Sequence, residues 1–201
     1  MMNIEDIRAY LPKYLSETST TNLFNELSQF PDNIDSRMYC AQSFYSDEIL
    51  QGDGLQNLLV VNLPDSRIEK GNCLVMTNSC DNDMLNERLY PTCICYCPIF
   101  SLEKFKFKLK QSYSEEPVEQ FVRSIKKQKI SQVFYLPKGS NLNCDSFVFL
   151  DRVCNCDNSF VDRIELGKKK LFTLSNYGFY MFLFKLSIHF TRIREGIDRA
   201  A

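Results

Sequence analysis

Short apolar runs, each bounded by turn-forming residues, dominate the middle of the chain. Five of them are partly β-branched or aromatic and predict β-strands. They are LLVVNLP (58–64), CLVMTNS (73–79), PTCICYCPI (91–99), SQVFYLP (131–137) and DSFVFLDRV (145–153). The runs do not alternate regularly with helical segments, so the pattern favours a mainly antiparallel sheet over a parallel one.

The first third of the chain has helical spacing followed by loop. The stretch STTNLFNELSQF (19–30) begins with capping residues and places Leu23, Leu27 and Phe30 on one face, and a proline follows it. Residues 31–54 read mostly as loop and end in QGDG, a strong turn pattern. We therefore expect an N-terminal segment of helix and loop.

The lysine-rich stretch SLEKFKFKLKQ (101–111) fits two structures. As a strand it would put both phenylalanines on one side, whereas as a helix capped by Ser101 it would put Leu102, Phe105 and Leu109 on one face. We favour the helix, because a Ser-x-Glu opening suits a helix start. PVEQFVRSIKKQK (117–129) predicts a second helix, with proline in its first turn and a basic end.

The most apolar window of the chain, YGFYMFLFKLSIHF (177–190), is 14 residues long. A membrane-spanning helix needs about 20 apolar residues, and this window also contains Lys185 and His189. It therefore predicts a long buried C-terminal helix, from about Asn176 to Arg194, and no membrane span.

These elements together predict an α+β fold. We expect a small, twisted, mainly antiparallel β-sheet or barrel, with an N-terminal helical segment and a long buried C-terminal helix. Residues 1–50 would form the segment that packs on the main domain, and residues 51–201 would form a β-barrel-like domain with the C-terminal helix.

Charge is spread unevenly along a chain whose net charge is only −1. Residues 1–57 carry nine acids and three bases, whereas residues 101–138 carry nine bases and four acids. Such asymmetry can mark a face for nucleic acid or for an acidic partner, and it can also mean that the two segments neutralise each other.

The chain has nine cysteines, an odd number, and its start, MMNIEDIRAY, does not resemble a signal peptide. We therefore expect a cytoplasmic protein with reduced thiols. Cys93, Cys95, Cys154 and Cys156 form two C-x-C pairs, a weak zinc pattern, because zinc ribbons and knuckles use C-x-x-C. Buried free cysteines on a sheet are the stronger interpretation, so we expect no metal and no cofactor.

The strand end CLVMTNSCDND (73–83) is the candidate for chemistry. Cys80 and Asp81 come directly after a predicted strand, where a thiolate could act as a nucleophile if a base lowered its pKa. His189 is the one histidine of the sequence, so a Cys–His pair would have to use it. The alternative is a structural turn in which Asp81 caps backbone N–H groups and Cys80 packs as a small apolar residue.

A phosphate-binding role completes this hypothesis. Asp81 would orient substrate or act as a base, while cations held the phosphate backbone. The candidate nucleic-acid-binding residues are Thr77, Ser79, Arg192, Lys126 and Lys127. Nucleotide-binding loops, zinc-protease motifs, serine-hydrolase elbows and EF-hand loops are absent from the sequence, which leaves no standard catalytic template.

Four stretches, QGDG, LVMTNSCDND, YCPIF and FYLP…DSFVFLD, resemble in this order a group of uncharacterised bacterial and phage proteins with an SxxCD strand end. The helix KLSIHFTR looks similar as well. In layout the group is similar to the SH3-like barrels of the PemK/MazF toxins, which are RNA endonucleases of toxin–antitoxin pairs. The resemblance implies an SH3-like barrel and an RNA target. The chain departs from the toxin pattern, because NCLVMTNS lacks an Arg-Pro pair before the serine strand.

Two functions follow as hypotheses. In the first, the chain is a bacterial cytoplasmic protein of a toxin–antitoxin or phage-defence module that binds or cleaves RNA, and any enzyme activity would be that of an endoribonuclease-like hydrolase. Its partners would be RNA and a cognate protein encoded nearby. In the second, it is a non-catalytic protein–protein interaction module that uses an acidic N-terminal face including Asp32, Asp35, Asp47 and Glu48.

Overall fold

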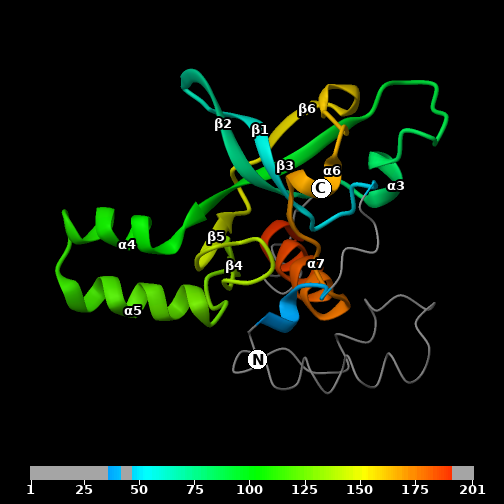
Figure 1. The fold of residues 1–201 in the computed structure, drawn as a ribbon. Coiled ribbons are helices and arrows are strands. Elements are labelled where there is room, and N and C mark those ends of the chain that lie inside the picture. Colours follow the sequence, from blue (N-terminus) through cyan, green and yellow to red (C-terminus); the bar gives the residue numbers. More distant parts are fainter. Residues whose placement is uncertain (1–35, 42–46, 192–201) are drawn as a thin grey trace, which may run out of the picture.

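A computed structural model of the chain describes residues 36–41 and 47–191. Its centre is an antiparallel sheet of seven strands in the order β4-β5-β3-β2-β1-β7, with β6 paired to β3 (Figure 1). The strands are β1 (Gly54–Asn62), β2 (Asp65–Val75), β3 (Cys93–Ser101), β4 (Val133–Leu136), β5 (Ser146–Phe149), β6 (Cys154–Asp157) and β7 (Lys170–Phe172). The predicted α+β class is confirmed.

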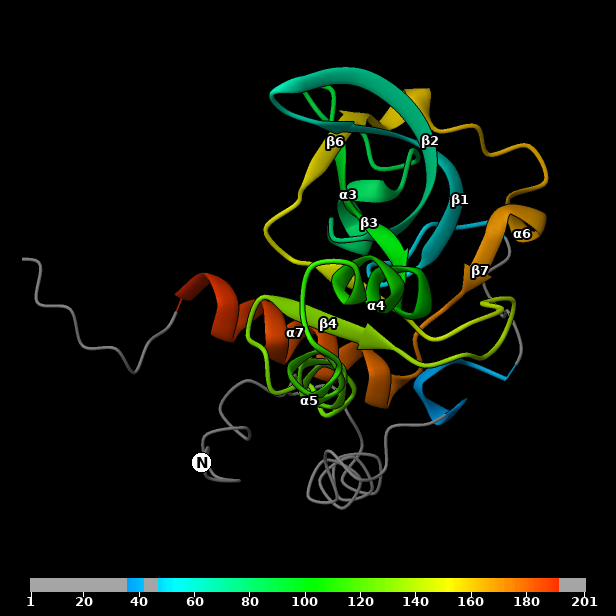
Figure 2. The same cartoon turned by 90° about the vertical axis from the view of Figure 1, so that its left-hand side faces the viewer.

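Helices cover the sheet and its ends. They are the short 3-10 helices η1 (Ser36–Met38) and η2 (Asn158–Phe160) and the α-helices α3 (Ser79–Asn82), α4 (Leu102–Lys110), α5 (Glu115–Lys126), α6 (Leu166–Lys169) and α7 (Asn176–Thr191). The largest core cluster joins α7, which lies along one face of the sheet (Figure 2), to the strands. In this cluster the rings of Phe182 of α7 and Phe134 of β4 lie 5.3 Å apart, tilted by 48°. Residues 37 and 38 bind the start of α7, because Ser175 donates to the carbonyls of Arg37 and Met38.

The two-residue alternation of β3 separates two cores. Cys97 faces the α7 side, whereas Ile94 and Tyr96 face a second cluster with Cys73 and Val75. A third cluster lies under α4 and α5, where Val122 and Ile125 pack on Phe147 of β5. The sheet therefore has buried residues on both faces, as the near-continuous apolar runs of the sequence require.

Of the two forms expected, a sheet or an SH3-like barrel, the structure shows an open sheet, so the barrel is not confirmed. A barrel needs its first and last strands to pair, and here the end strands of the sheet, β4 and β7, do not pair with each other. Strand β3 instead pairs with two short strands in turn. Its first part, Cys93–Tyr96, pairs with β6, and its last part, Ile99–Ser101, pairs with β5.

Amide side chains close both ends of this open sheet. Gln128 lies beside β4 and bonds to both backbone groups of Tyr135, accepting from its N–H at 3.0 Å and donating to its carbonyl at 2.9 Å. Asn141 lies beside β7, with its backbone N–H on the Leu171 carbonyl and its side chain on the Lys170 carbonyl. Each amide takes the place of a further strand, which protects an edge from unwanted pairing.

The predicted helix over residues 101–111 is confirmed as α4. The Ser101 hydroxyl accepts from the backbone N–H of Lys104, as a capping residue should. The second predicted helix corresponds to α5, which places Pro117 in its first turn. The helix expected over 19–30 lies outside the described residues, as do the last residues of the helix expected over 176–194, of which α7 covers Asn176–Thr191.

The turn QGDG connects three strands. Gly52 adopts a left-handed conformation with φ of 89°, and a Cβ there would lie 2.7 Å from a Leu174 methyl. A Cβ on Gly54 would lie 2.5 Å from the Phe172 ring of β7. The residue between them, Asp53, accepts the backbone N–H of Val75 in β2. Both glycines are thus required by close packing against the segment that leads into α7.

A buried ion pair lies at the same place. The Asp53 carboxylate is 2.8 Å from the Lys170 ammonium, and the two side chains are 0% and 4% exposed. The backbone N–H of Leu50 also donates to this carboxylate at 2.9 Å. Burial raises the pKa of Asp53, and the nearby charge of Lys170 opposes that rise. The pair links the start of β1 to β7.

We expect Asp53→Ala to lower the free energy of unfolding by about 3–5 kcal/mol, because it leaves the Lys170 ammonium buried without its counter-charge. Urea unfolding followed by circular dichroism measures the change. The double variant Asp53→Asn/Lys170→Met should cost less than Asp53→Ala alone. Glu115→Gln, which breaks an exposed ion pair, is the control and should unfold like the wild type. An Asp53→Ala protein as stable as this control would contradict the assigned role.

Candidate functional site

The segment NSCDN forms one helical turn after β2. Strand β2 ends at Val75, and the Asn78 side chain then accepts the backbone N–H of Cys80 at 2.9 Å. The Ser79 hydroxyl accepts the backbone N–H of Gln51 at 3.0 Å, which ties the turn to the QGDG loop. Asn78 is therefore the residue that caps α3.

A buried polar network fixes this turn from behind. Asn82 is 2% exposed and donates to the carbonyls of Ile49 and Thr77. Asn158 of η2, also 2% exposed, donates to the carbonyls of Asp81 and Asn82. Arg163 donates to the Asn158 side chain at 2.6 Å and to the Asn82 carbonyl at 3.1 Å. Because buried polar groups are costly unless paired, this network makes the turn rigid.

Cys80 and Asp81 point away from that network. Cys80 is exposed, and the Asp81 carboxylate forms an ion pair with Arg88 at 2.6 Å. The structural alternative considered for this turn is therefore wrong in its details, because Asp81 does not cap the helix and Cys80 is not packed. Asn86 and Arg88 also donate to the Cys80 carbonyl, at 2.8 and 3.1 Å.

The structure does not bring His189 to Cys80. His189 lies in the last turn of α7, where its ring packs 4.7 Å from that of Phe190. Figures 1 and 2 both show this end of α7 apart from α3. Arg192, the cation expected beside His189, lies outside the described residues. The described part of the chain thus contains no Cys80–His189 pair.

The remaining candidates are dispersed. The Thr77 hydroxyl bonds to both backbone groups of Cys95, accepting at 2.5 Å and donating at 3.4 Å, so it serves the junction of β2 and β3. Lys126 forms an ion pair with Asp145 at 2.6 Å. Lys127 is exposed at the end of α5. Of the acidic face, Asp32 and Asp35 lie outside the described residues, while Asp47 and Glu48 are exposed.

The two C-x-C pairs lie on opposite faces of the sheet. Cys154 is opposite Tyr96 and Cys156 is opposite Ile94, so these thiols share the face of the second core. Cys93 and Cys95 alternate with Ile94 and Tyr96 and therefore face the other way. No group of three or more His, Cys, Asp or Glu residues within 36–41 and 47–191 is arranged to hold a metal ion.

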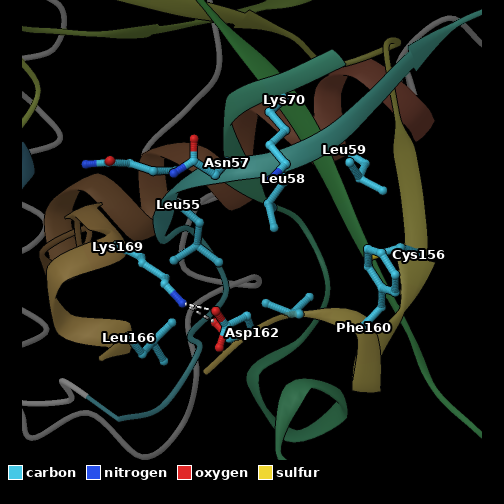
Figure 3. Close-up of a pocket in the computed structure, with 12 residues that line it drawn as sticks. Leu55, Asn57, Leu58, Leu59, Lys70, Cys156, Phe160, Asp162, Leu166 and Lys169 are labelled. Atoms are coloured by element: carbon cyan, nitrogen blue, oxygen red, sulfur yellow. Dashed lines mark hydrogen bonds and ion pairs between the residues drawn. The ribbon is translucent and has the colours of Figure 1, made fainter. Parts of the chain in front are cut away.

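A pocket of 420 Å³ lies between β1, η2 and α6 (Figure 3). Its floor is apolar, with Leu55, Leu58 and Leu166, and an ion pair between Asp162 and Lys169 lies at its side. The bulge in β1 that shapes it contains Asn57 with φ of 62°. Sequence reasoning missed this pocket, because it depends on a bulge that has no glycine to mark it.

Helices α4 and α5 form a hairpin that projects from the sheet (Figure 1). Lys106 and Lys110 of α4 pair with Glu119 and Glu115 of α5 at 2.7 and 2.6 Å, which holds the two helices side by side. Five exposed cations of this hairpin take part in no ion pair within the described residues. They are Lys104, Lys108, Arg123, Lys127 and Lys129.

The hairpin also exposes aromatic rings. Phe105 is packed in the core, 4.9 Å from the Phe147 ring, whereas Phe107 is 67% exposed. Tyr113, in the loop between the helices, is 64% exposed. Because α4 is a helix, Phe107 lies on the side opposite the core, one turn from Lys104. We call Lys104, Phe107, Lys108, Arg123 and Lys127 the outer face of the hairpin.

A buried lysine holds the base of this hairpin. Lys185 of α7 is 3% exposed, and its ammonium donates to the carbonyls of Gln128 and Ile130, just after α5, at 3.0 and 2.5 Å. A cation at the carboxyl end of a helix interacts favourably with the helix dipole. Burial nevertheless lowers the pKa of Lys185 to about 8.

Comparison with known proteins identifies no family. No protein-family model matches the sequence, and no curated protein is significantly similar to it. Among the described helices, none is both long enough and apolar enough to cross a membrane.

We expect Asn158→Ala to destabilise the protein by about 2–3 kcal/mol, because the Asp81 carbonyl would lose the Asn158 amide as its donor and the Asn82 carbonyl would keep only Arg163. Asp81→Asn and Cys80→Ala should leave the urea midpoint nearly unchanged, since both side chains are exposed. Equal losses from all three variants would contradict the division between a buried network and an exposed turn surface.

We expect the contribution of Lys185 to stability to rise with pH. Between about pH 8 and pH 10.5 the unfolded chain still holds the proton of Lys185 while the folded chain has released it, so rising pH favours the folded state. Urea unfolding of the wild type and of Lys185→Met at pH 7.5 and pH 10 isolates this residue. The difference between the two proteins should move by about 2 kcal/mol in favour of the wild type. A difference independent of pH would contradict the assignment.

Proposed function

We propose that the chain binds single-stranded RNA through the outer face of the α4–α5 hairpin. The observation that carries this proposal is the combination of unpaired cations with an exposed aromatic ring on one projecting element. On α4, Lys104 lies one turn from both Lys108 and Phe107, while Arg123 and Lys127 are one turn apart at the end of α5. Grooves and faces that bind single strands combine cations that follow the phosphates with rings on which bases stack.

The ion pairs of the hairpin concentrate its positive charge on this outer face. Glu115 and Glu119 are occupied by Lys106 and Lys110 between the helices, and Lys126 is occupied by Asp145. Lys104, Lys108, Arg123 and Lys127 form no ion pair within the described residues. Binding through such cations displaces counter-ions from the nucleic acid, so it depends strongly on salt.

The exposed ring supports a single strand over a duplex. Phe107 is exposed on one side of α4, whereas Phe105 and Leu109 pack against the core on the other side. An exposed ring beside a lysine can stack on an unpaired base, but bases in a duplex are already stacked on each other.

The resemblance to the PemK/MazF toxins directs the proposal to RNA and to a bacterial toxin–antitoxin or phage-defence module. The proposal includes binding and no cleavage step. Cleavage would need a nucleophile or base with a partner, and Cys80, Asp81 and His189 do not lie together in the described part of the chain. Of the residues predicted for RNA contact, Lys127 belongs to the proposed surface.

Fluorescence anisotropy with a labelled single-stranded RNA oligonucleotide tests this proposal. We expect the double variant Lys104→Gln/Lys108→Gln to weaken binding and to lower the slope of log affinity against log salt by about 1.4, since each lost phosphate contact on a single strand accounts for about 0.7. Phe107→Ala should weaken binding about tenfold or more with little change in that slope, because it removes stacking and no charge.

The matched control is Lys168→Gln/Lys169→Gln, which makes the same change in net charge on α6, away from the hairpin (Figure 1). This control should bind like the wild type. Equal weakening by the control would show that only overall charge matters and would contradict the proposed surface. A wild-type protein that fails to bind RNA at low salt would remove the proposal.

A further inference from the structure

The β1–β2 hairpin rises beyond the rest of the sheet as an arm (Figure 1). Strand β2 pairs with β1 along the arm, from Val61 opposite Ile68 down to Leu55 opposite Cys73. Its other edge pairs with β3 only over Cys73–Val75. From Asp65 to Asn72, no strand of the described chain pairs with this outer edge of β2.

The pairing of β2 with β3 shows which backbone N–H and carbonyl groups of β2 point to that outer edge. Cys73 is opposite Pro98, which has no N–H, so the hydrogen-bonded pair of β2 and β3 is Leu74 with Cys97. Every second residue of β2 therefore directs its N–H and carbonyl to the outer side, and this sequence continues to Lys70 and Ile68.

Strand β1 independently gives the same direction. Its carbonyls at Leu59 and Val61 accept hydrogen bonds from Tyr96 and Cys154, on the side away from β2. Leu59 is opposite Lys70 and Val61 is opposite Ile68. In an antiparallel pair, opposite residues either both face each other or both face outward, so Lys70 and Ile68 face outward.

We infer that a second copy of this chain pairs with this edge, β2 against β2, in an antiparallel arrangement with two-fold symmetry. Gln128 and Asn141 border the end strands β4 and β7, whereas residues 65–72 of β2 have no strand of the described chain on their outer side. A two-fold interface must be complementary to itself, which the sequence of β2 can test directly. This inference does not depend on the proposed binding of RNA.

Charge and backbone pairing together favour one register. Centring the pair on Ile68 places Ile68 opposite Ile68 and Arg67 opposite Glu69 of the second copy, twice by symmetry. The outward groups of Ile68 then bond to each other, as the backbone direction requires. Moving the centre by one residue instead places Arg67 opposite Arg67, or Glu69 opposite Glu69, and like charges directly opposite are unfavourable. A pair centred on Ser66 would also place Arg67 opposite an acid, Asp65, but it would set Ile68 opposite Pro64, which has no N–H.

The same register buries apolar side chains that the single chain exposes. Val61 and Ile68 are directly opposite each other and share one face, with 37% and 64% of their surface exposed. Pairing would extend them into a row of four residues, Val61 and Ile68 from each copy, across a four-stranded ribbon. Because each copy contributes only a short edge, we expect a dissociation constant in about the micromolar range or weaker.

Sedimentation velocity tests this inference on the full chain in reducing buffer, from roughly a few to several hundred micromolar. We expect the wild type to form dimers with rising concentration. Arg67→Glu and Glu69→Arg should each remain monomeric, because each sets like charges opposite each other. The double variant Arg67→Glu/Glu69→Arg should dimerise again, since it restores opposite charges in the same register.

The control is the exposed pair on α6, where Lys168→Glu and Glu165→Lys make the same charge changes away from the arm and should leave dimerisation unchanged. A wild type that stays monomeric over the whole series would overturn the inference and leave the edge to an extended peptide of another protein. A dimer that both single variants retain, or that the double variant fails to restore, would also overturn it.

Discussion

The buried ion pair between Asp53 and Lys170 is the interaction on which the rest of the fold depends. It joins the residue before β1 to the first residue of β7. Asp53 lies between Gly52 and Gly54, whose lack of a Cβ allows Leu174 and Phe172 to approach. The backbone carbonyl of Asp53 also accepts Val75 at the end of β2. Because a desolvated charge is tolerated only with its partner, the pair fixes how β1, β2 and β7 meet.

Local features of the sequence predicted many elements of the fold but not the closure of the sheet. Ser101 followed by Glu103 identified the start of α4, and the apolar runs identified most strands, because these signals lie within a few residues. Whether the sheet closes depends on how its end strands β4 and β7 lie relative to each other, and these two strands are distant in the sequence. Strand β6 was missed because its cysteines and polar residues lack an apolar alternation.

The candidate site could likewise be predicted only as far as its signals are local in the sequence. The sequence located the turn after β2, since small polar residues follow an apolar run. It could not show that Asn158 and Arg163 hold that turn, because Asn158 lies 76 residues from its partner Asn82. The outer face of the hairpin could have been predicted from the sequence. Residues 101–111 as a strand would put Phe105 and Phe107 on one side, whereas the helix exposes Phe107 and buries Phe105. The structure thus moves attention from the NSCDN turn to α4.

The most direct test of the RNA-binding surface is ultraviolet crosslinking of the full chain to a single-stranded uridine-rich RNA, with the crosslinked peptides identified by mass spectrometry. We predict crosslinks concentrated on the peptides that contain Phe107 and Tyr113, whose rings are exposed beside the unpaired lysines of α4. Crosslinks confined to the NSCDN turn or to the pocket beside α6, with none on the hairpin, would contradict the account.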